Sequence, residues 1–426
     1  MSELLVSGGT PLEGELTVHG AKNSVLPILA ACLLTREQVT IHNCPRLTDV
    51  AAALEILEHL GCTAQWDDGA LTLDPSAADG GEIPEQLMRS MRSSIIFLGP
   101  VLARSGAVRL TYPGGCELGP RPIDLHLAAM RSLGAHVAAG TEGLLCEGRL
   151  TGCDIHLSIP SVGATENAML AAMGAEGTTY ISNAAREPEI VDLERFLNCL
   201  GGRVRGAGSS VISVEGMRHL SGGHYTIMGD RIVAATLLAA GAAAGGSVRL
   251  KGVDWRHVAT VSAVLMEAGC GVYSDGQGVT LHRDPARPLR GVSTIRTAPY
   301  PGFPTDAQAP VMAALAAGQG TTMFVENMFD SRYRHVSELA RMGADITVEG
   351  RVALVRGVRR LHGARVEATD LRGGGALAVA ALGAEGETVI TGVHHIDRGY
   401  AGLEDMVRRL GGTMKRREDT DEAKGA

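Results

Sequence analysis

Two kinds of hydrophobic segment alternate along this chain. In the first kind, apolar residues cover every side of the expected helix, and Ala, Leu and Met dominate the composition. A helix without a polar side is buried on all sides, so these segments predict helices in the interior of the fold. They span residues 25–34, 94–102, 167–173, 232–243, 309–317 and 376–382.

The second kind of segment is an amphipathic helix that ends at a glycine. Residues 49–60 and 333–342 are examples, each with a polar and an apolar side. A glycine at the end of such a helix predicts a left-handed C-cap. The closing glycines recur at intervals of 67 to 74 residues, at Gly61, Gly134, Gly201, Gly269, Gly343 and Gly411. This regularity indicates six copies of one structural unit.

A short strand follows each apolar segment, which completes the pattern of the unit. These strands are predicted at residues 38–42, 107–111, 178–183, 247–250, 321–325 and 387–391. Each unit is therefore expected to be β-α-β-α-β-β, with three units in a domain. Since small Ala-rich helices can pack closely, we expect them in the centre of each domain with the sheets outside, an inside-out α/β fold.

A chain of 426 residues is too long for one ordinary core, so two domains are expected. We place the first at residues 22–229 and the second at residues 1–21 plus 230–417, with the change of domain between 222 and 230. The stretch from Lys415 onward is dense in charge, and we expect a disordered tail over residues 418–426.

Composition narrows the possible partners. The net charge of −8 and the aromatic content of 3% argue against a nucleic-acid or membrane partner, so a small-molecule partner is expected. The eight cysteines form no C-x-x-C pair or zinc spacing, which favours reduced thiols and a cytoplasmic protein without a metal or redox cofactor. The N-terminus has no secretion-signal pattern.

One stretch combines a thiol with a guanidinium, the segment from Tyr112 to Asp124. Its glycines and prolines predict a loop with flexible and stiff positions that closes over a ligand. Arg121 lies five residues after Cys116, and a nearby guanidinium would favour the thiolate. The alternative is a surface turn with an incidental thiol.

A lysine and an asparagine stand where the first apolar helix begins. Lys22 and Asn23 follow a glycine turn, which predicts an anion site at a helix N-terminus; the alternative is a solvated lysine. Four further sequence motifs occur along the chain, at residues 161–165, 301–306, 370–372 and 396–400. Together with the Cys116 loop, these motifs resemble the UDP-N-acetylglucosamine 1-carboxyvinyltransferases, a family of enolpyruvyl transferases in peptidoglycan synthesis. The resemblance extends from about residue 5 to residue 417.

The resemblance implies the enolpyruvyl transferase fold and a specific reaction. The enolpyruvyl group of phosphoenolpyruvate would pass to the 3-hydroxyl of UDP-N-acetylglucosamine, with release of phosphate, as the first committed step toward the cell wall and hence cell shape and division. Cys116 matches the family's proton donor, which can also form a covalent adduct with phosphoenolpyruvate. Asp306 matches the proposed base, although an Asp there can equally cap a helix. Both halves of the chain would then contribute to the site.

The resemblance also implies the residues that hold each substrate. Catalytic positions are Cys116, Asp306, Lys22 and Arg398. Phosphoenolpyruvate, with its two anionic groups, would be held by Lys22, Asn23, Arg121, Arg332, Arg372 and Arg398. UDP-N-acetylglucosamine would contact Asn23, Arg92, Arg121, Pro122, Ile123, Asp124, Leu125, Ser161, Val162, Gly163, Asp306 and Met328.

Several positions depart from the family pattern. Val233 stands where Glu is usual, Pro160 where some members have Lys, and Pro310 is expected to interrupt the helix after Asp306. The run from Gly373 to Gly375 lacks the usual Ala. Because of these departures, an alternative is a catalytically silent paralogue that binds nucleotide-sugar as a regulator. A shikimate-pathway enolpyruvyl transferase is the other alternative, but it lacks the Pro-Gly-Gly-Cys segment. The sequence leaves the oligomeric state open.

Overall fold

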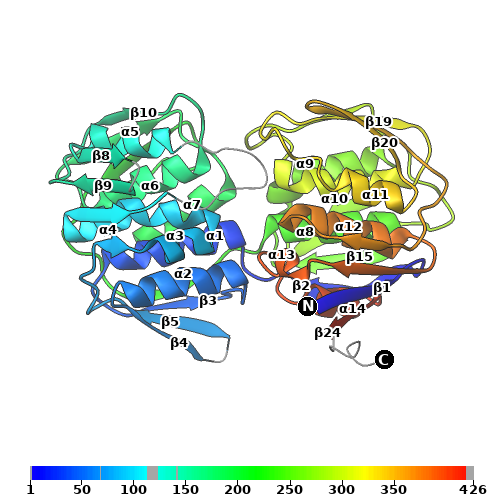
Figure 1. Ribbon diagram of the computed structural model, residues 1–426, viewed down its shortest axis with the longest axis horizontal. Helices are drawn as coiled ribbons and strands as arrows, with labels where there is room; N and C mark the ends of the chain where they lie inside the picture. The colour runs from blue at the N-terminus through cyan, green and yellow to red at the C-terminus, as the bar shows by residue number, and fades with distance from the viewer. Residues whose placement is uncertain (1, 68, 113–122, 141–142, 419–426) are drawn as a thin grey trace, which may run out of the picture. The chain divides into compact units, whose positions relative to one another are not determined.

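The computed structural model describes residues 2–67, 69–112, 123–140 and 143–418, apart from the side chain of Arg92. The residues that lie close together in space form two compact units (Figure 1). Unit 1 comprises residues 1–19 and 229–426, and unit 2 comprises residues 20–228. Within the described residues, each unit contains three four-stranded sheets and three interior helices.

The interior helices of unit 2 are the apolar segments of its three repeats. They are α1 (Lys22–Ala31) with the 3-10 helix η1 (Cys32–Leu34), the 3-10 helix η2 (Arg92–Phe97) with α4 (Leu98–Ser105), and α6 (Val162–Met173). The outer helices are α2 (Thr48–His59), α5 (Asp124–Ser132) and α7 (Pro188–Cys199), with the short α3 (Glu85–Ser90).

The three sheets of unit 2 share one topology. In each, a parallel strand pair is followed by two antiparallel strands. The orders are β14 (Gly223–Thr226), β3 (Val39–His42), β5 (Ala70–Asp74), β4 (Thr63–Asp67); β6 (Glu82–Ile83), β7 (Ala107–Leu110), β9 (Gly143–Glu147), β8 (His136–Gly140); and β10 (Asp154–His156), β11 (Thr178–Ser182), β13 (Val211–Glu215), β12 (Arg203–Arg205).

Unit 1 repeats this arrangement. Its interior helices are α8 (Arg231–Ala244), α10 (Thr305–Ala316) and α12 (Leu371–Gly383), and its outer helices are α9 (Trp255–Glu267), α11 (Val336–Arg341), α13 (Val393–Ile396) and α14 (Leu403–Arg409). The sheet orders are β16 (Gly271–Ser274), β17 (Gly278–Arg283), β15 (Gly246–Lys251), β2 (Leu12–Thr17); β18 (Thr294–Arg296), β19 (Thr321–Val325), β21 (Val352–Arg356), β20 (Asp345–Glu349); and β22 (Arg365–Glu367), β23 (Glu387–Thr391), β1 (Ser2–Ser7), β24 (Thr413–Glu418).

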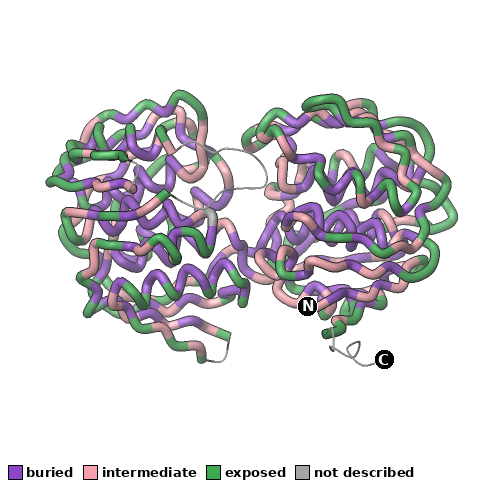
Figure 2. Tube along the Cα trace, in the orientation of Figure 1, coloured by how far each residue is buried: buried purple, intermediate pink, exposed green. Residues whose placement is uncertain are grey.

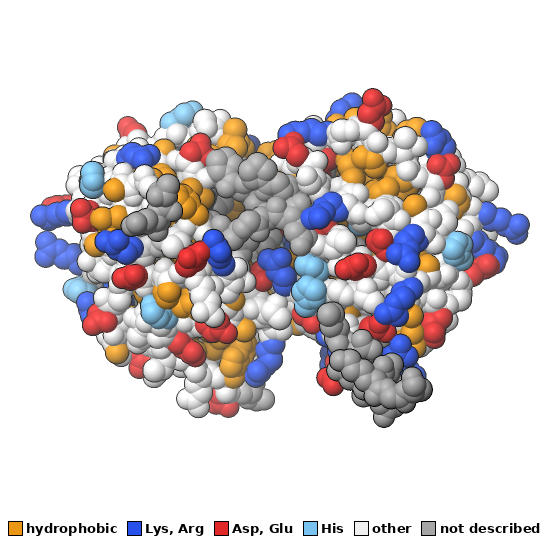
Figure 3. All heavy atoms as spheres, viewed as in Figure 1, with side chains coloured by type: hydrophobic (Ala, Val, Ile, Leu, Met, Phe, Trp, Pro, Cys, Tyr) orange, Lys and Arg blue, Asp and Glu red, His pale blue; other side chains and the backbone are white. Residues whose placement is uncertain are grey.

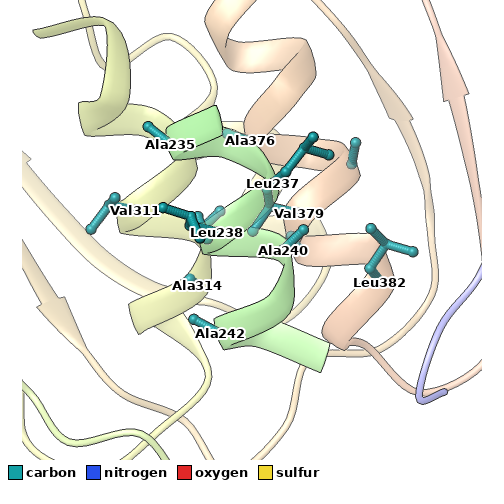
Figure 4. Close-up of a cluster of buried hydrophobic side chains, with 14 of the residues drawn as sticks. Ala235, Leu237, Leu238, Ala240, Ala242, Val311, Ala314, Ala376, Val379 and Leu382 are labelled. Carbon is teal, nitrogen blue, oxygen red and sulfur yellow. The ribbon is translucent and has the colours of Figure 1, made fainter. Parts of the chain in front are cut away.

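Small side chains let the three interior helices of unit 1 approach closely. Leu237 and Leu238 stand between alanines in α8, which lies between α10 with Ala314 and α12 with Val379 (Figure 4). All of these side chains are buried, and Figure 2 shows the same burial along the interior helices. The expected inside-out α/β fold with buried central helices is therefore confirmed.

The closing glycines have the backbone conformation that the sequence predicted. All six have positive φ, from +80° at Gly411 to +109° at Gly269. Side chains with a Cβ rarely adopt this region, so each glycine ends its helix and turns the chain into the next strand.

Three details differ from the sequence expectations. Pro310 does not interrupt a helix, because α10 continues through it; burial on all sides stabilises α10 in spite of the missing N–H. The helix expected over 333–342 begins only at Val336, after a turn. Lys415 to Glu418 form part of β24, where pairing with β1 and ion pairs of Arg416 and Arg417 order the charged stretch. Residues 419–426 lie outside the described residues.

Surface features add two observations. Among the described residues, no helix is long and apolar enough to cross a membrane. On the face shown in Figure 3, acidic and basic side chains are interspersed over both units.

Candidate active site

In unit 1, one carboxylate lies between two buried guanidinium groups. Asp306, in the first turn of α10, accepts hydrogen bonds from Nη2 of Arg332 at 2.6 Å and from Nη2 of Arg372 at 3.0 Å. The arginine side chains are 3% and 4% exposed, whereas that of Asp306 is 27% exposed. Three residues predicted from distant parts of the sequence therefore meet at one carboxylate.

The two arginines keep further donor capacity. Nε of Arg332 and Nη1 of Arg372 are buried and have no hydrogen-bond partner among the described atoms. A buried N–H group without a partner is costly, and a guanidinium fits planar anions such as carboxylate and phosphate. Burial lowers the pKa of Arg372, but Asp306, Tyr400 and Asp230 together outweigh burial, so that the net shift of the pKa is upward. The cluster carries a net positive charge at neutral pH and can bind an anion.

The N-terminus of α12 is held by an aspartate and lies against a buried histidine. Oδ1 of Asp370 accepts the backbone N–H groups of Arg372 and Gly373 at 3.0 and 2.9 Å, which fixes the first turn. Burial lowers the pKa of His335 to about 4, with Asp370 opposing and Arg332 adding to the shift. The imidazole is therefore neutral at pH 7. Sequence reasoning did not single out His335, whose only signal was its position three residues after Arg332.

A buried glutamate organises the segment that contains Met328. Oε1 of Glu326 accepts hydrogen bonds from the backbone N–H of Met328 at 2.7 Å and from Thr297 Oγ1 at 2.9 Å. Its Oε2 accepts from Thr305 Oγ1 at 2.9 Å, at the first residue of α10. Glu326 therefore ties the exposed Met328 to the helix that carries Asp306. The sequence signal for Glu326 was an acidic residue directly after a predicted strand, and it was missed.

Arg398 follows α13 and is half-buried. The preceding residue, Asp397, accepts two hydrogen bonds from Arg416 of β24, at 2.7 and 2.9 Å. Arg416 also pairs with Glu404 of α14. These contacts fix the backbone on which the Arg398 side chain stands.

In unit 2, Lys22 is the first residue of α1 and forms a buried ion pair. Its Nζ lies 2.6 Å from Oδ2 of Asp49 in the first turn of α2, and the two side chains are 10% and 4% exposed. Asn23 follows and is half-buried. Asp49 was missed by sequence reasoning, because an acid in the first turn of a helix is common for electrostatic reasons alone.

The interior helices of unit 2 begin on the same side of that unit. Their C-terminal ends meet, because Arg104 of α4 donates to the Leu33 carbonyl at 2.8 Å and a Cβ on Gly174, after α6, would lie 2.6 Å from that of Ala103. The three interior helices belong to equivalent repeats and run in one direction. Because their C-terminal ends meet on one side of unit 2, their N-terminal ends lie together on the other side. Three predicted segments lie at these starts: Lys22 with Asn23, the segment from Arg92, and residues 161–163.

Two predicted nucleotide-sugar segments are fixed by helix starts. Ser161 caps α6 by accepting the N–H of Ala164 at 3.4 Å, which leaves Val162 and Gly163 half-buried in its first turn. Ile123 precedes α5, whose first turn contains the exposed Asp124 and the half-buried Leu125. Both segments therefore combine a defined backbone with accessible atoms.

Other predicted residues lie outside the described part of the structure. Cys116, Arg121 and Pro122 are among them, as is the side chain of Arg92. Two of the described thiols, Cys44 and Cys62, are buried and unlike a reactive thiol. Burial raises the pKa of Cys44 to about 12 and of Cys62 to about 11, so these thiols are protonated at neutral pH.

The departures from the family pattern can now be placed. Val233 is fully buried in the first turn of α8, where its backbone N–H donates to the capping Asp230 at 3.0 Å. This bond does not depend on the side chain at 233. Pro160 is half-buried and precedes the capping Ser161. Within the described residues, no group of three or more His, Cys, Asp or Glu side chains is arranged to hold a metal ion.

Comparison with known sequences identifies relatives over the whole chain. The family model of EPSP synthase (3-phosphoshikimate 1-carboxyvinyltransferase) matches residues 6–407. UDP-N-acetylglucosamine 1-carboxyvinyltransferase 2 of Caldanaerobacter subterraneus subsp. tengcongensis is 47% identical over 98% of this chain and 100% of the relative. UDP-N-acetylglucosamine 1-carboxyvinyltransferase 1 of Symbiobacterium thermophilum is 48% identical over 97% of this chain and 94% of the relative.

Solved structures share the fold. The enolpyruvyl transferase NikO from Streptomyces tendae superposes with a TM-score of 0.87 at 27% identity, covering 98% of this chain and 99% of NikO. An EPSP synthase from Acinetobacter baumannii superposes with a TM-score of 0.73 at 19% identity, covering 98% of this chain and 100% of that one, and shows the fold alone. The sequence and structural matches together place this chain in the UDP-N-acetylglucosamine 1-carboxyvinyltransferase family, within the larger group of enolpyruvyl transferases.

Proposed function

We propose that this protein transfers the enolpyruvyl group of phosphoenolpyruvate to the 3-hydroxyl of UDP-N-acetylglucosamine and releases inorganic phosphate. The observation that carries the proposal is the sequence identity of 47%, over 98% of this chain, to a UDP-N-acetylglucosamine 1-carboxyvinyltransferase. The Asp306 cluster supports it, because two buried guanidinium groups with unpartnered N–H atoms suit a substrate that has both a carboxylate and a phosphate.

In the proposed reaction, a proton first adds to the methylene carbon of phosphoenolpyruvate. Cys116 is the proposed donor, and the neighbouring C2 becomes electrophilic. The sugar 3-hydroxyl gives its proton to Asp306 while its oxygen bonds to C2. The resulting tetrahedral adduct loses a proton from the former methylene carbon, which returns to Cys116, and phosphate leaves from C2 with the proton that Asp306 took up. The enol ether and the released phosphate together therefore contain all the atoms of the two substrates.

The arginines are proposed to bind the anion and to control Asp306. Phosphoenolpyruvate brings acceptors for Nε of Arg332 and Nη1 of Arg372, which lack partners among the described atoms. Arg398, Lys22, Asn23 and Arg121 are the further proposed contacts to this substrate. Asp306 stays within reach of the same donors, so that its negative charge is stabilised until it takes up the sugar proton.

The nucleotide-sugar is proposed to lie mainly along unit 2. The half-buried Ser161, Val162 and Gly163, together with Ile123 to Leu125, offer backbone and side-chain atoms at helix starts. Arg92, Arg121 and Pro122 complete the set in unit 2, and Met328 contributes from unit 1. Peptidoglycan synthesis is then the pathway, with cell shape and division depending on it. The seven described cysteines are free thiols, which supports a cytoplasmic protein.

A comparison of acceptors tests the proposal against its alternatives. Phosphate release from phosphoenolpyruvate is measured with UDP-N-acetylglucosamine, with shikimate 3-phosphate, and with neither. We expect release only with the nucleotide-sugar. Release with shikimate 3-phosphate would support the other enolpyruvyl transferase, and binding of nucleotide-sugar without release would support the silent paralogue.

A substitution tests the proposed role of Cys116. Cys116→Ser should abolish turnover and covalent labelling by an epoxide phosphonate, because the hydroxyl of serine is a far weaker acid and nucleophile than a thiol. Cys199→Ser, at an exposed described thiol, is the control and should retain both. Unchanged labelling of Cys116→Ser would contradict the assigned role.

A further inference from the structure

We propose that Asn167 is a positioning residue that sets the spacing of three of the four segments of unit 2 assigned to nucleotide-sugar binding, those at Arg92, residues 123–125 and residues 161–163. The inference rests on the proposed function. Asn167 is fully buried in α6 and was not among the predicted site residues. Its side-chain amide connects α6 to η2, α4 and α5.

The amide of Asn167 makes three hydrogen bonds to other helices. Its Oδ1 accepts the backbone N–H of Gly99 at 2.8 Å. Its Nδ2 donates to the carbonyl of Ile95 at 2.9 Å and lies 2.8 Å from Nδ1 of His126. Three of the four hydrogen bonds available to an asparagine are used, all with buried partners.

The bond to His126 fixes one form of the imidazole. Because Nδ2 of an amide can only donate, Nδ1 of His126 must accept, and the ring is neutral with its proton on Nε2. Burial lowers the pKa of His126 to about 4, with Asp124 opposing, which agrees with a neutral ring. Donor and acceptor roles are thereby set throughout the network.

Three of the four connected helices, η2, α5 and α6, carry one assigned segment each. Ile95 lies in η2, which begins at Arg92; His126 lies in the first turn of α5, directly after residues 123–125; and Asn167 lies one turn after residues 161–163. The imidazole also packs on the first turn of α6, since a Cβ on Gly163 would lie 3.2 Å from its Cε1. One amide therefore determines how far apart the three segments stand.

The fit around Asn167 leaves no room for adjustment. A Cβ on Gly99 would lie 2.5 Å from the backbone oxygen of Asn167 and 3.0 Å from its Oδ1. Distances below 3.0 Å require one of the helices to move. The close approach of α4 to α6, and with it the donor position of Gly99, thus depends on glycine at this position.

The test compares two variants of the network with a matched control. Asn167→Asp keeps the volume and the Oδ1 acceptor but places a carboxylate oxygen against two acceptors, Ile95 O and His126 Nδ1. His126→Phe keeps an aromatic ring, larger than imidazole, and removes the acceptor, so the test remains valid if the first variant does not fold. Asn198→Ala is the control, because Asn198 also bridges backbone groups, N–H and C=O of Val204, but joins none of the three segments.

Calorimetric Kd for UDP-N-acetylglucosamine and the kinetic constants are measured for wild type and variants. We expect Kd and KM for the nucleotide-sugar to rise on the order of tenfold to a hundredfold in both network variants, as misplaced contacts cause. KM for phosphoenolpyruvate should stay near wild type, and the control should match wild type throughout. A purely structural role would instead lower the active fraction and leave KM unchanged.

Two outcomes would overturn the inference, and they are distinguishable. If wild type binds the nucleotide-sugar and folded network variants bind it equally well, Asn167 does not position the segments. If wild type itself binds no nucleotide-sugar, the proposed function fails, and the inference with it.

Discussion

At the scale of single residues, the site of unit 1 depends on opposite charges that are buried together. Arg332 and Arg372 are almost completely buried, and Asp306 is the carboxylate that both contact. Bringing two guanidinium groups this close without a counter-charge would be strongly unfavourable. Asp306 therefore has a structural role before substrate arrives, in addition to its proposed role as a base.

Removing this carboxylate should destabilise the protein. Asp306→Ala leaves two buried like charges, and we expect the free energy of unfolding to fall by about 3–5 kcal/mol. Asp345→Ala removes a carboxylate from an exposed pair with Arg356 and should cost about 0–1 kcal/mol. Urea denaturation of the whole protein in phosphate-free buffer measures the free energy of unfolding of both variants. Equal losses in the two variants would show that the Asp306 pairs do not contribute as described.

A buried histidine should make stability depend on pH. The pKa of His126 is lowered by burial to about 4 in the folded protein, against an ordinary value near 6.5 in the unfolded chain. The unfolded state therefore takes up the proton first as pH falls. The contribution is fully present above pH ~6.5 and is lost progressively toward pH ~4, by on the order of 3 kcal/mol. His335 has a shift in the same direction.

His126→Asn isolates this effect, because the new amide can still accept from Asn167 but does not titrate. The free energy of unfolding of wild type should fall more than that of the variant between pH 7 and pH 4.5. Parallel pH dependences would show that His126 is not held neutral.

At the scale of elements, the interior helices explain both the success and the errors of sequence prediction. Their apolar middles were recognised because a helix without a polar side has a clear pattern. Their first turns were missed for α6, α10 and α12, since these turns contain polar residues and glycines, among them Glu166, Asp306 and Arg372. Polar residues and glycines at helix starts break the pattern by which a buried helix is recognised.

The glycines at the start of α12 are also explained at this scale. A Cβ on Gly375 would lie 2.5 Å from Oη of Tyr400, a fully buried side chain whose hydroxyl lies 3.0 Å from Thr236 Oγ1. The departure from an Ala-containing run therefore accommodates a tyrosine that also lies beside Arg372.

Gly375→Ala should consequently destabilise the protein. Overpacking costs about 1–3 kcal/mol, which exceeds the gain of up to ~1 kcal/mol from the better helix propensity of Ala. Gly140→Ala, at a position with no atom within 4 Å of the new Cβ, should change stability by less than about 0.5 kcal/mol. Thermal denaturation measures the two variants side by side. A stabilised Gly375→Ala would mean that Tyr400 moves freely.

At the scale of the whole molecule, strands from distant parts of the sequence complete the sheets. The N-terminal β1 lies between β23 and β24, and β2 pairs with β15. In unit 2, β14 pairs with β3 from almost the other end of that unit. Residues 1–21 were expected to belong with residues 230–417, but the periodic pattern could not show which strands pair, because an isolated strand carries no signal for its partner.

Deleting residues 2–7 should therefore affect one unit selectively. Loss of β1 removes the buried Leu4 and Val6 and leaves the facing edges of β23 and β24 unpaired. Hydrogen exchange should accelerate in β23, β24 and the adjacent α12, while β11 and β13 of unit 2 stay protected. Uniform acceleration in both units, or none in β23, would contradict this description.

The site was predictable to a different degree from the fold. Asp306, Arg332 and Arg372 were predicted from the family resemblance, at separate places in the sequence, and the structure brings them together. Asp49, Glu326 and His335 were missed, since a buried acid or imidazole becomes recognisable only when its partner in the fold is known. The roles of Cys116 and Arg121 remain predictions from resemblance.

The most direct test of the central claim is the mass of the nucleotide product. The protein is incubated with phosphoenolpyruvate and UDP-N-acetylglucosamine, and the nucleotide-sugar is analysed by mass spectrometry beside a reaction without phosphoenolpyruvate. The account predicts a gain of one carboxyvinyl group, matched by an equal amount of released phosphate. An unchanged nucleotide-sugar, in a preparation that binds it, would contradict the account.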